Sequence, residues 1–145
     1  MSAVHPIDQH PDLLALRAGY ERAAESVPAQ ATFGLALLAA VYAAISPWIV
    51  GFSATATRIT VNDLIAGVAA ALLAVGFSSA LDRTHGLTWT LPVIGVWLII
   101  SPWVIAPSVA PTDGVIASNV VAGALVTLFG LMATYFGRSR AVSGR

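Results

Sequence analysis

The sequence of 145 residues contains no cysteine and no lysine, and only 10% of its residues are charged. The absence of cysteine excludes disulfides, thiolate metal sites and redox-active thiols. Soluble domains usually carry about 25% charged residues, so the small charged fraction excludes an ordinary soluble enzyme and a disordered chain. Seven arginines balance seven acidic residues. A chain without net charge creates no overall field that would attract nucleic acid.

Long apolar stretches are abundant instead. Hydrophobic residues make up 57% of the chain and the mean hydropathy is +0.82. A transmembrane helix needs about 20 mostly apolar residues, and four stretches reach about that length without a charged residue or a histidine: 31–52, 64–81, 87–106 and 115–136. Soluble cores do not supply such lengths with charges only between them. The sequence therefore predicts an all-α membrane protein with four transmembrane helices.

The arginines predict the orientation of these helices. Arg58 stands alone between the first two spans, whereas six arginines flank the other ends of the spans: Arg17, Arg22, Arg83, Arg138, Arg140 and Arg145. Because cytoplasmic segments carry the excess of basic residues, we expect both termini in the cytoplasm and the loops near Arg58 and Asp113 outside. The first thirty residues lack the pattern of a signal peptide. We expect the chain in a cytoplasmic membrane.

Residues 11–27 have the pattern of a short amphipathic helix ahead of the first span. Pro11 and Asp12 suit a helix N-terminus. Apolar residues recur at helical spacing along one stripe, which comprises Leu13, Leu16, Tyr20, Ala24 and Val27. Two interpretations are open. The helix lies on the inner membrane surface, or it docks a partner in the cytoplasm or the membrane.

The chain contains an internal repeat. Residues 45–48, Ile-Ser-Pro-Trp, recur 55 positions later as residues 100–103. An aromatic residue stands five positions before each proline, Tyr42 in the first copy and Trp97 in the second. Each copy is followed by a loop and a second apolar stretch. We expect two tandem two-helix repeats, 31–81 and 82–137, between a cytoplasmic arm, 1–30, and a cytoplasmic tail, 138–145.

The second stretches of the two repeats also correspond. Asn62 and Asp63 precede Gly67 as Ser118 and Asn119 precede Gly123, with an offset of 56 positions. An even number of spans per repeat keeps both repeats in one orientation. We therefore expect a pseudo-twofold axis along the membrane normal, as in other proteins with parallel repeats, and both Ser-Pro-Trp motifs toward the outer face.

The paired motifs resemble those of the SPW-repeat family of small bacterial membrane proteins. In that family a Ser-Pro-Trp motif occurs in the first of two transmembrane helices of each repeat. The resemblance covers roughly residues 31–137 and implies a two-repeat, four-helix membrane protein. It implies no activity, cofactor or catalytic residue.

Each motif combines a proline without an N–H, a serine and an amphipathic indole. The proline frees the carbonyl four residues earlier, and we expect the serine to satisfy local backbone groups there. The tryptophan then lies at headgroup depth. The motif is thus a kinked helix end with a membrane anchor, or one half of an outer-face site for a lipid, a quinone or a partner subunit. The residues are Ser46, Pro47, Trp48, Ser101, Pro102 and Trp103.

Other polar residues near the span ends predict helix caps. Thr60 and Asp63 have the spacing of a capping box, so we expect Asp63 to cap the second span. Ser118 is a candidate cap of the fourth span, and Asn119 is expected to hydrogen-bond across a helix interface. Residues 62, 63, 118 and 119 are also candidate contacts for a partner or a lipid.

Small residues predict close helix packing. Gly67 and Ala71 form a small-xxx-small pair in the second span, and Gly123 with Thr127 forms a weaker one in the fourth. We expect these pairs to pack the two repeats against each other.

The sequence offers little chemistry. No set of nucleophile, base and acid can be assembled, and His5, His10 and His85 do not form a metal or haem site, so we expect no cofactor and no enzymatic activity. The predicted spans hold no ionisable residue, which disfavours an ion-coupled carrier. We expect a non-catalytic structural or accessory subunit of a larger membrane assembly, or a homo-oligomer. The alternative is a lipid- or quinone-binding module with an outer groove between the repeats.

Overall fold

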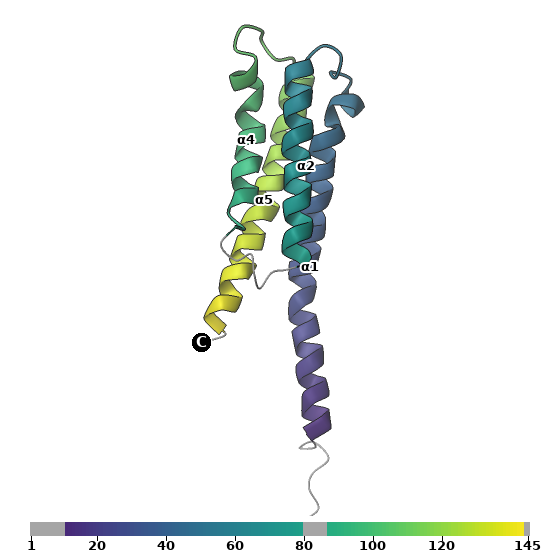
Figure 1. Cartoon of the computed structure of the whole chain (residues 1–145), viewed down its shortest axis with the longest axis vertical. Coiled ribbons are helices and arrows are strands. Elements are labelled where there is room, and N and C mark those ends of the chain that lie inside the picture. The colour runs from purple at the N-terminus through teal and green to yellow at the C-terminus, as the bar shows by residue number, and fades with distance from the viewer. Residues whose placement is uncertain (1–10, 80–86, 144–145) are drawn as a thin grey trace, which may run out of the picture.

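The computed structural model describes residues 11–79 and 87–143, and these residues form four helices without strands (Figure 1). The helices are α1 (Pro11–Val50), α2 (Thr57–Ser79), α4 (Thr90–Ile105) and α5 (Asp113–Ser143). The prediction of an all-helical chain is confirmed. The loops that join α1 to α2 and α4 to α5 lie at the same end of the bundle (Figure 1). We call this end, with residues 51–56 and 106–112, the loop end.

Three of the four helices meet the length and hydropathy of a membrane span: Val27–Val50, Thr57–Ser78 and Asp113–Phe136. The fourth, α4, is apolar but has only 16 residues. At 1.5 Å per residue such a helix is about 24 Å long, shorter than the roughly 30 Å of a hydrocarbon core. Large apolar side chains are exposed around the outside of the bundle, for example Leu38, Ile65 and Leu72. Exposed apolar flanks are what helices that face lipid require.

α1 differs from its prediction at the N-terminus. It is one continuous helix of 40 residues with Pro28 and Pro47 inside it. Residues 11–27 are helical, but they are not a separate short helix ahead of the span. The expected side-chain stripe of Leu13, Leu16 and Tyr20 is outside the described part of the structure. Pro28 removes one backbone hydrogen bond, and the helix continues past it. In the next turn the Thr32 hydroxyl donates to the Pro28 carbonyl at 2.8 Å.

The start of α2 is also corrected. The predicted span began at Leu64, whereas the helix begins at Thr57. Arg58 and Asp63 therefore lie within the candidate span Thr57–Ser78, contrary to the expectation that the spans hold no ionisable residue. The predicted span was begun after Asp63 because that residue is charged. A helix can contain a charged residue whose side chain has a partner.

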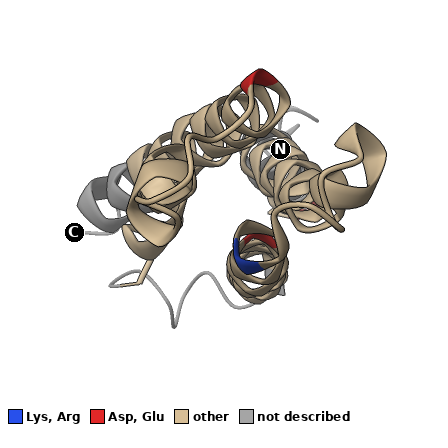
Figure 2. Ribbon diagram, turned by 90° about the horizontal axis from the view of Figure 1, so that it is seen from above, with Lys and Arg blue, Asp and Glu red and all other residues tan. Residues whose placement is uncertain are grey.

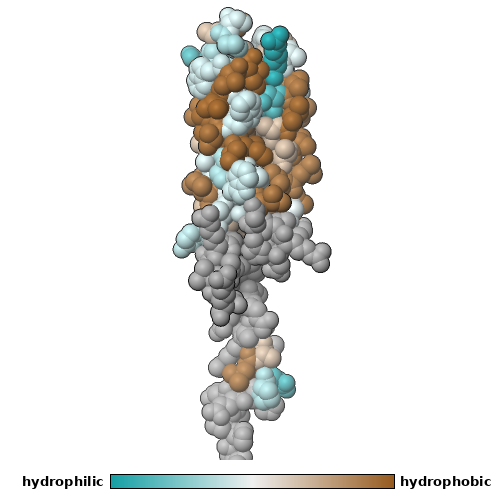
Figure 3. All heavy atoms as spheres, turned by 60° about the vertical axis from the view of Figure 1, so that its left-hand side comes forward, coloured by the Kyte–Doolittle hydropathy of each residue, from teal (hydrophilic) through white to brown (hydrophobic). Residues whose placement is uncertain are grey.

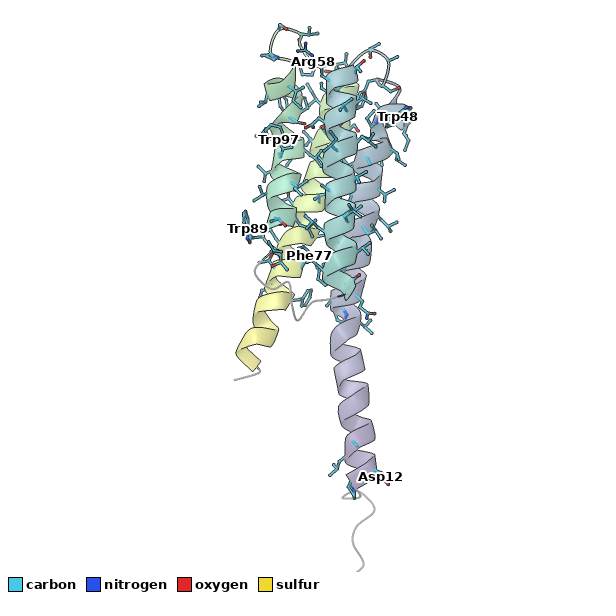
Figure 4. All side chains as sticks on the ribbon, viewed as in Figure 1. Asp12, Trp48, Arg58, Phe77, Trp89 and Trp97 are labelled. Carbon is cyan, nitrogen blue, oxygen red and sulfur yellow. The ribbon has the colours of Figure 1, made fainter. Side chains whose placement is uncertain are left out.

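The four helices surround a common core. Viewed along the bundle (Figure 2), α1 lies beside α2 and α5, and α4 lies beside α5 and α2. Of these four neighbouring pairs, α2 and α4 make the least extensive contact. The core consists mostly of alanine, with larger side chains such as Phe33, Phe77, Leu98 and Val126. Phe33 and Phe77 pack with their ring centroids 6.3 Å apart, and Phe77 lies towards the end of the bundle opposite the loop end (Figure 4).

Glycines allow close helix contacts, and those at Gly67 and Gly123 lie within each repeat. A Cβ on Gly67 of α2 would lie 2.5 Å from the Ala44 backbone nitrogen and 2.8 Å from the Ala40 carbonyl oxygen, both in α1. A Cβ on Gly123 of α5 would lie 2.5 Å from the Gly95 carbonyl oxygen in α4. The expectation that Gly67 and Gly123 pack the two repeats against each other was wrong. Ala71 is half-buried and packs against the common core.

Candidate functional site

The two Ser-Pro-Trp motifs end α1 and α4 in the same way. Pro47 frees the Ala43 carbonyl, and the Ser46 hydroxyl donates to that oxygen at 3.0 Å. In α4 the Ser101 hydroxyl donates to the Leu98 carbonyl at 3.0 Å. Both serines are fully buried. The prediction that each serine satisfies the carbonyl freed by its proline is confirmed.

The tryptophans of the motifs point away from the core. Trp48 is 54% exposed and Trp103 is 47% exposed, and Figure 4 shows Trp48 on the outer flank of α1 near the loop end. This placement suits an amphipathic ring at the level of lipid headgroups. A groove rimmed by Trp48 and Trp103 for a lipid or quinone stays a prediction.

The polar pairs that follow the motifs lie inside helices and are not caps. Asp63 is in the second turn of α2, and Ser118 and Asn119 are in the second turn of α5. The capping box was wrong, because the Thr60 hydroxyl donates to the Ala56 carbonyl at 3.1 Å and α2 begins three residues earlier. The expectation that Ser118 caps α5 was also wrong, because α5 begins at Asp113, five residues before Ser118.

Asp63 and Asn119 meet between the two repeats. The Asn119 side-chain amide donates to Asp63 Oδ2 at 3.1 Å and to the Val115 carbonyl at 3.1 Å. The Asn62 amide donates to Asp63 Oδ1 at 3.2 Å. The side chains of Asp63 and Asn119 are 1% and 2% exposed. Each carboxylate oxygen thus has an amide donor, as a buried carboxylate requires, and the expected bond of Asn119 across a helix interface is confirmed.

The same cluster reaches α4 through two further residues. The Ser101 hydroxyl lies 3.3 Å from Asn119 Oδ1, and the Trp97 indole N–H donates to Asn62 Oδ1 at 2.8 Å. We name this group the axial cluster: Asn62, Asp63, Trp97, Ser101 and Asn119. It connects α2, α4 and α5 within the apolar bundle. In the sequence Trp97 was noted only as the repeated aromatic residue five positions before a proline. That spacing, which Tyr42 shares in the first copy, was the sequence signal for a structural role of Trp97.

Ser118 has a different environment from the cluster. Its side chain is 4% exposed, and its hydroxyl has no hydrogen-bond partner. By the repeat offsets Ser118 corresponds to Asn62 and Tyr42 corresponds to Trp97. Thus the bonded pair of Trp97 and Asn62 has no hydrogen-bonded counterpart at Ser118.

A cavity of about 550 Å³ opens at the loop end. Its walls come from the α1–α2 loop and the start of α2, and from the α4–α5 loop and the start of α5. Arg58 lines it and lies at the loop end in Figure 4. Figure 3 shows the most hydrophilic surface of the bundle at this end, above a flank that is largely apolar. Trp48 and Trp103 do not line this cavity.

The described residues contain no cluster of three or more His, Cys, Asp or Glu side chains that could hold a metal ion. His5, His10 and His85 lie outside the described residues. The polar groups that do meet, carboxylate, amides, hydroxyl and indole, are paired with one another. The arrangement binds helices together, and none of its residues lines the loop-end cavity.

Long apolar helices around a buried polar cluster define a small multi-pass membrane protein. The chain matches the SPW repeat domain over residues 30–133. It therefore belongs to the SPW-repeat family, as the paired motifs predicted. Among curated proteins and solved structures no match is found.

Proposed function

We propose that the chain is a non-catalytic accessory subunit of a larger membrane assembly, to which it docks through the N-terminal part of α1. The observation that carries this proposal is the continuity of α1 from Pro11 to Val50. Because the helix does not break at Pro28, its first turns extend beyond the end of α2 (Figure 1).

An extended helix of this kind favours a protein partner over the membrane surface. In proteins most helical stability comes from the packing of an apolar face. Val27 of the stripe is exposed, at 60%, and the sequence places the other apolar residues of the stripe at helical spacing before it. A helix that continues the direction of a span leaves the membrane instead of lying on it, so a second protein is the partner that would cover the stripe.

We further propose that the two repeats are related by a pseudo-twofold axis along the membrane normal, with α4 as a fourth span. Equivalent residues support this. Gly67 meets residues 40 and 44 of α1, and Gly123 meets residues 95 and 99 of α4, which are the same positions shifted by the repeat offset of 55. Asp63 and Asn119, which also correspond, bond to each other. A contact between equivalent residues is expected on a twofold axis.

In this proposal the chain lies in the bacterial cytoplasmic membrane with both termini in the cytoplasm and the loop end outside. The distribution of arginine supports it, because Arg58 is the one arginine predicted on the loop side. The docking segment of α1 is then cytoplasmic. An accessory role also agrees with the pairing of Asp63, whose two oxygens are both held by amides, so that the carboxylate is a structural group and not a free ion site.

The test is extraction of the tagged full chain from its native membranes in mild detergent, followed by mass spectrometry of the proteins that comigrate. We expect a defined set of membrane partners. The variant Leu16→Glu/Tyr20→Glu places charges on the stripe and should release them. The matched control, Ala15→Glu/Ala18→Glu, adds the same charges on the opposite face and should retain them.

Two results would contradict the proposal. The chain could migrate alone or only as crosslinked copies of itself, which would favour a homo-oligomer. Alternatively, both double variants could retain the same partners, which would remove the docking role of the N-terminal stripe.

A further inference from the structure

The cavity at the loop end lies where the two repeats face each other. Ile59 of α2 and Val115 of α5 both line it, and they correspond by the repeat offset of 56. Both side chains are buried, at 3% and 2% exposure. Together with Ala106 they give the cavity an apolar floor.

The axial cluster begins one helical turn beyond the residues of the floor, and none of its residues lines the cavity. Val115 lies one turn before Asn119, whose side-chain amide donates to the Val115 carbonyl at 3.1 Å. Ile59 likewise lies one turn before Asp63. A ligand in the cavity therefore meets apolar side chains at the bottom and not the buried carboxylate.

The upper part of the cavity is polar and positive. Arg58 is its one charged lining residue in the described part of the chain, and the hydroxyl residues Thr57 and Thr112 line it as well. Asp113, the acidic residue in the first turn of α5, does not line it. The N-termini of α2 and α5 also lie at this cavity. The first N–H groups of a helix lack intrahelical acceptors, and the helix dipole adds positive potential there.

We propose that this cavity binds an acidic amphiphile, a molecule with a carboxylate or phosphate group on an apolar chain. The acidic group lies at Arg58 and the apolar part lies on the floor of Ile59 and Val115. The volume of about 550 Å³ is within the usual range of small-molecule sites, about 300–1,000 Å³. This inference concerns the loop end and is independent of the docking role proposed for α1.

Binding of radiolabelled decanoate to the full chain in phosphatidylcholine nanodiscs tests the proposal. We expect saturable binding of decanoate, and little binding of decyltrimethylammonium, which has the same chain and the opposite charge. The variant Arg58→Gln should weaken decanoate binding about tenfold, as loss of a charge-assisted hydrogen bond predicts. Arg58→Lys keeps the charge and should lose less. Arg138→Gln removes the same charge far from the loop end and should bind as the native chain does.

A second variant tests the cavity itself. Ala110 lines it in the exposed α4–α5 loop, and Ala110→Trp should occupy the space and abolish decanoate binding without altering the bundle. Unchanged decanoate binding in both Arg58→Gln and Ala110→Trp would overturn the proposal. Equal binding of the two decyl compounds would also overturn it, as would tight binding of inorganic phosphate with none of decanoate.

Competition between decanoate and the lipids of the nanodisc identifies the source of the acidic amphiphile. If phosphatidylglycerol in the nanodisc displaces decanoate from the native chain but phosphatidylcholine does not, the ligand is an anionic lipid of the bilayer. If decanoate binding persists in phosphatidylglycerol, the ligand is a free single-chain acid. Either result supports an acidic amphiphile.

Discussion

The two repeats use the same small residue where their own helices meet, but different polar residues where they meet each other. Gly67 and Gly123 make corresponding backbone contacts inside their repeats. At the contact between the repeats the corresponding residues are Asp63 and Asn119, a carboxylate opposite an amide. Two carboxylates there would repel each other and leave two buried charges, whereas a carboxylate and an amide supply an acceptor and a donor. The two repeats thus keep the same glycine contact within each repeat. They differ at the contact between them, where the carboxylate and the amide form a complementary pair.

The largest effect is expected where the repeats are alike. Gly67→Ala and Gly123→Ala each place a Cβ 2.5 Å from a backbone atom of the neighbouring helix. The helices must separate, and we expect each variant to lower the free energy of unfolding by about 3 kcal/mol. Unfolding in mixed micelles of mild detergent and dodecyl sulfate measures the loss.

The control for these variants is Gly76→Ala. Nothing lies within 4 Å of a Cβ at Gly76, so alanine should be neutral or stabilise the helix by up to about 1 kcal/mol. Equal losses at Gly67 and Gly76 would show that helix contact is not the cause. A loss at Gly67 without one at Gly123 would show that the repeats do not share the packing rule.

A smaller effect is expected where the repeats differ. Asn119→Leu removes the donor to Asp63 Oδ2 and leaves a buried carboxylate oxygen without a partner. We expect it to lower the free energy of unfolding by about 2 kcal/mol. Asp63→Asn keeps an oxygen that can accept from Asn119, so its expected loss is about 1 kcal/mol. The same mixed-micelle unfolding compares the two, and a greater loss in Asp63→Asn would mean that the negative charge itself is required.

The smallest single loss is expected at Ser46, and comparison with Ser101 distinguishes the two motif serines. Ser46→Ala and Ser101→Ala each remove the donor to a carbonyl freed by proline, but Ser101 also contacts Asn119 at 3.3 Å. We expect losses of about 0.5 kcal/mol for Ser46→Ala and about 1.5 kcal/mol for Ser101→Ala. Thermal unfolding in one detergent measures the difference between them. Ser78→Ala is the control, since Ser78 is exposed and its hydroxyl donates to the Val75 carbonyl at 2.8 Å. Equal losses for Ser46 and Ser101 would remove Ser101 from the axial cluster.

Local rules predicted the helices and the bond made by each serine, but they failed at the helix boundaries. The carbonyl freed by Pro47 and the hydroxyl of Ser46 are neighbours in one turn, so their bond follows from the sequence. The start of α2 did not, because Asp63 was taken to end a span. Its tolerance inside the helix depends on Asn119, which is 56 positions away. The continuation of α1 through Pro28 was missed because one lost backbone bond is a small part of a helix of 40 residues.

The sequence alone determined the class of the protein, its family and the chemistry of the Ser-Pro-Trp motifs. These depend on composition and on residues within about four positions of each other, a range in which a helix fixes the geometry. Only the tertiary structure decided that Asp63 meets Asn119, that Trp97 bonds Asn62, and that the cavity at the loop end has Arg58 at its wall and an apolar floor. Such contacts join different helices, and their distances depend on how the small residues let the helices approach and rotate against one another. No local pattern in a single sequence encodes that rotation.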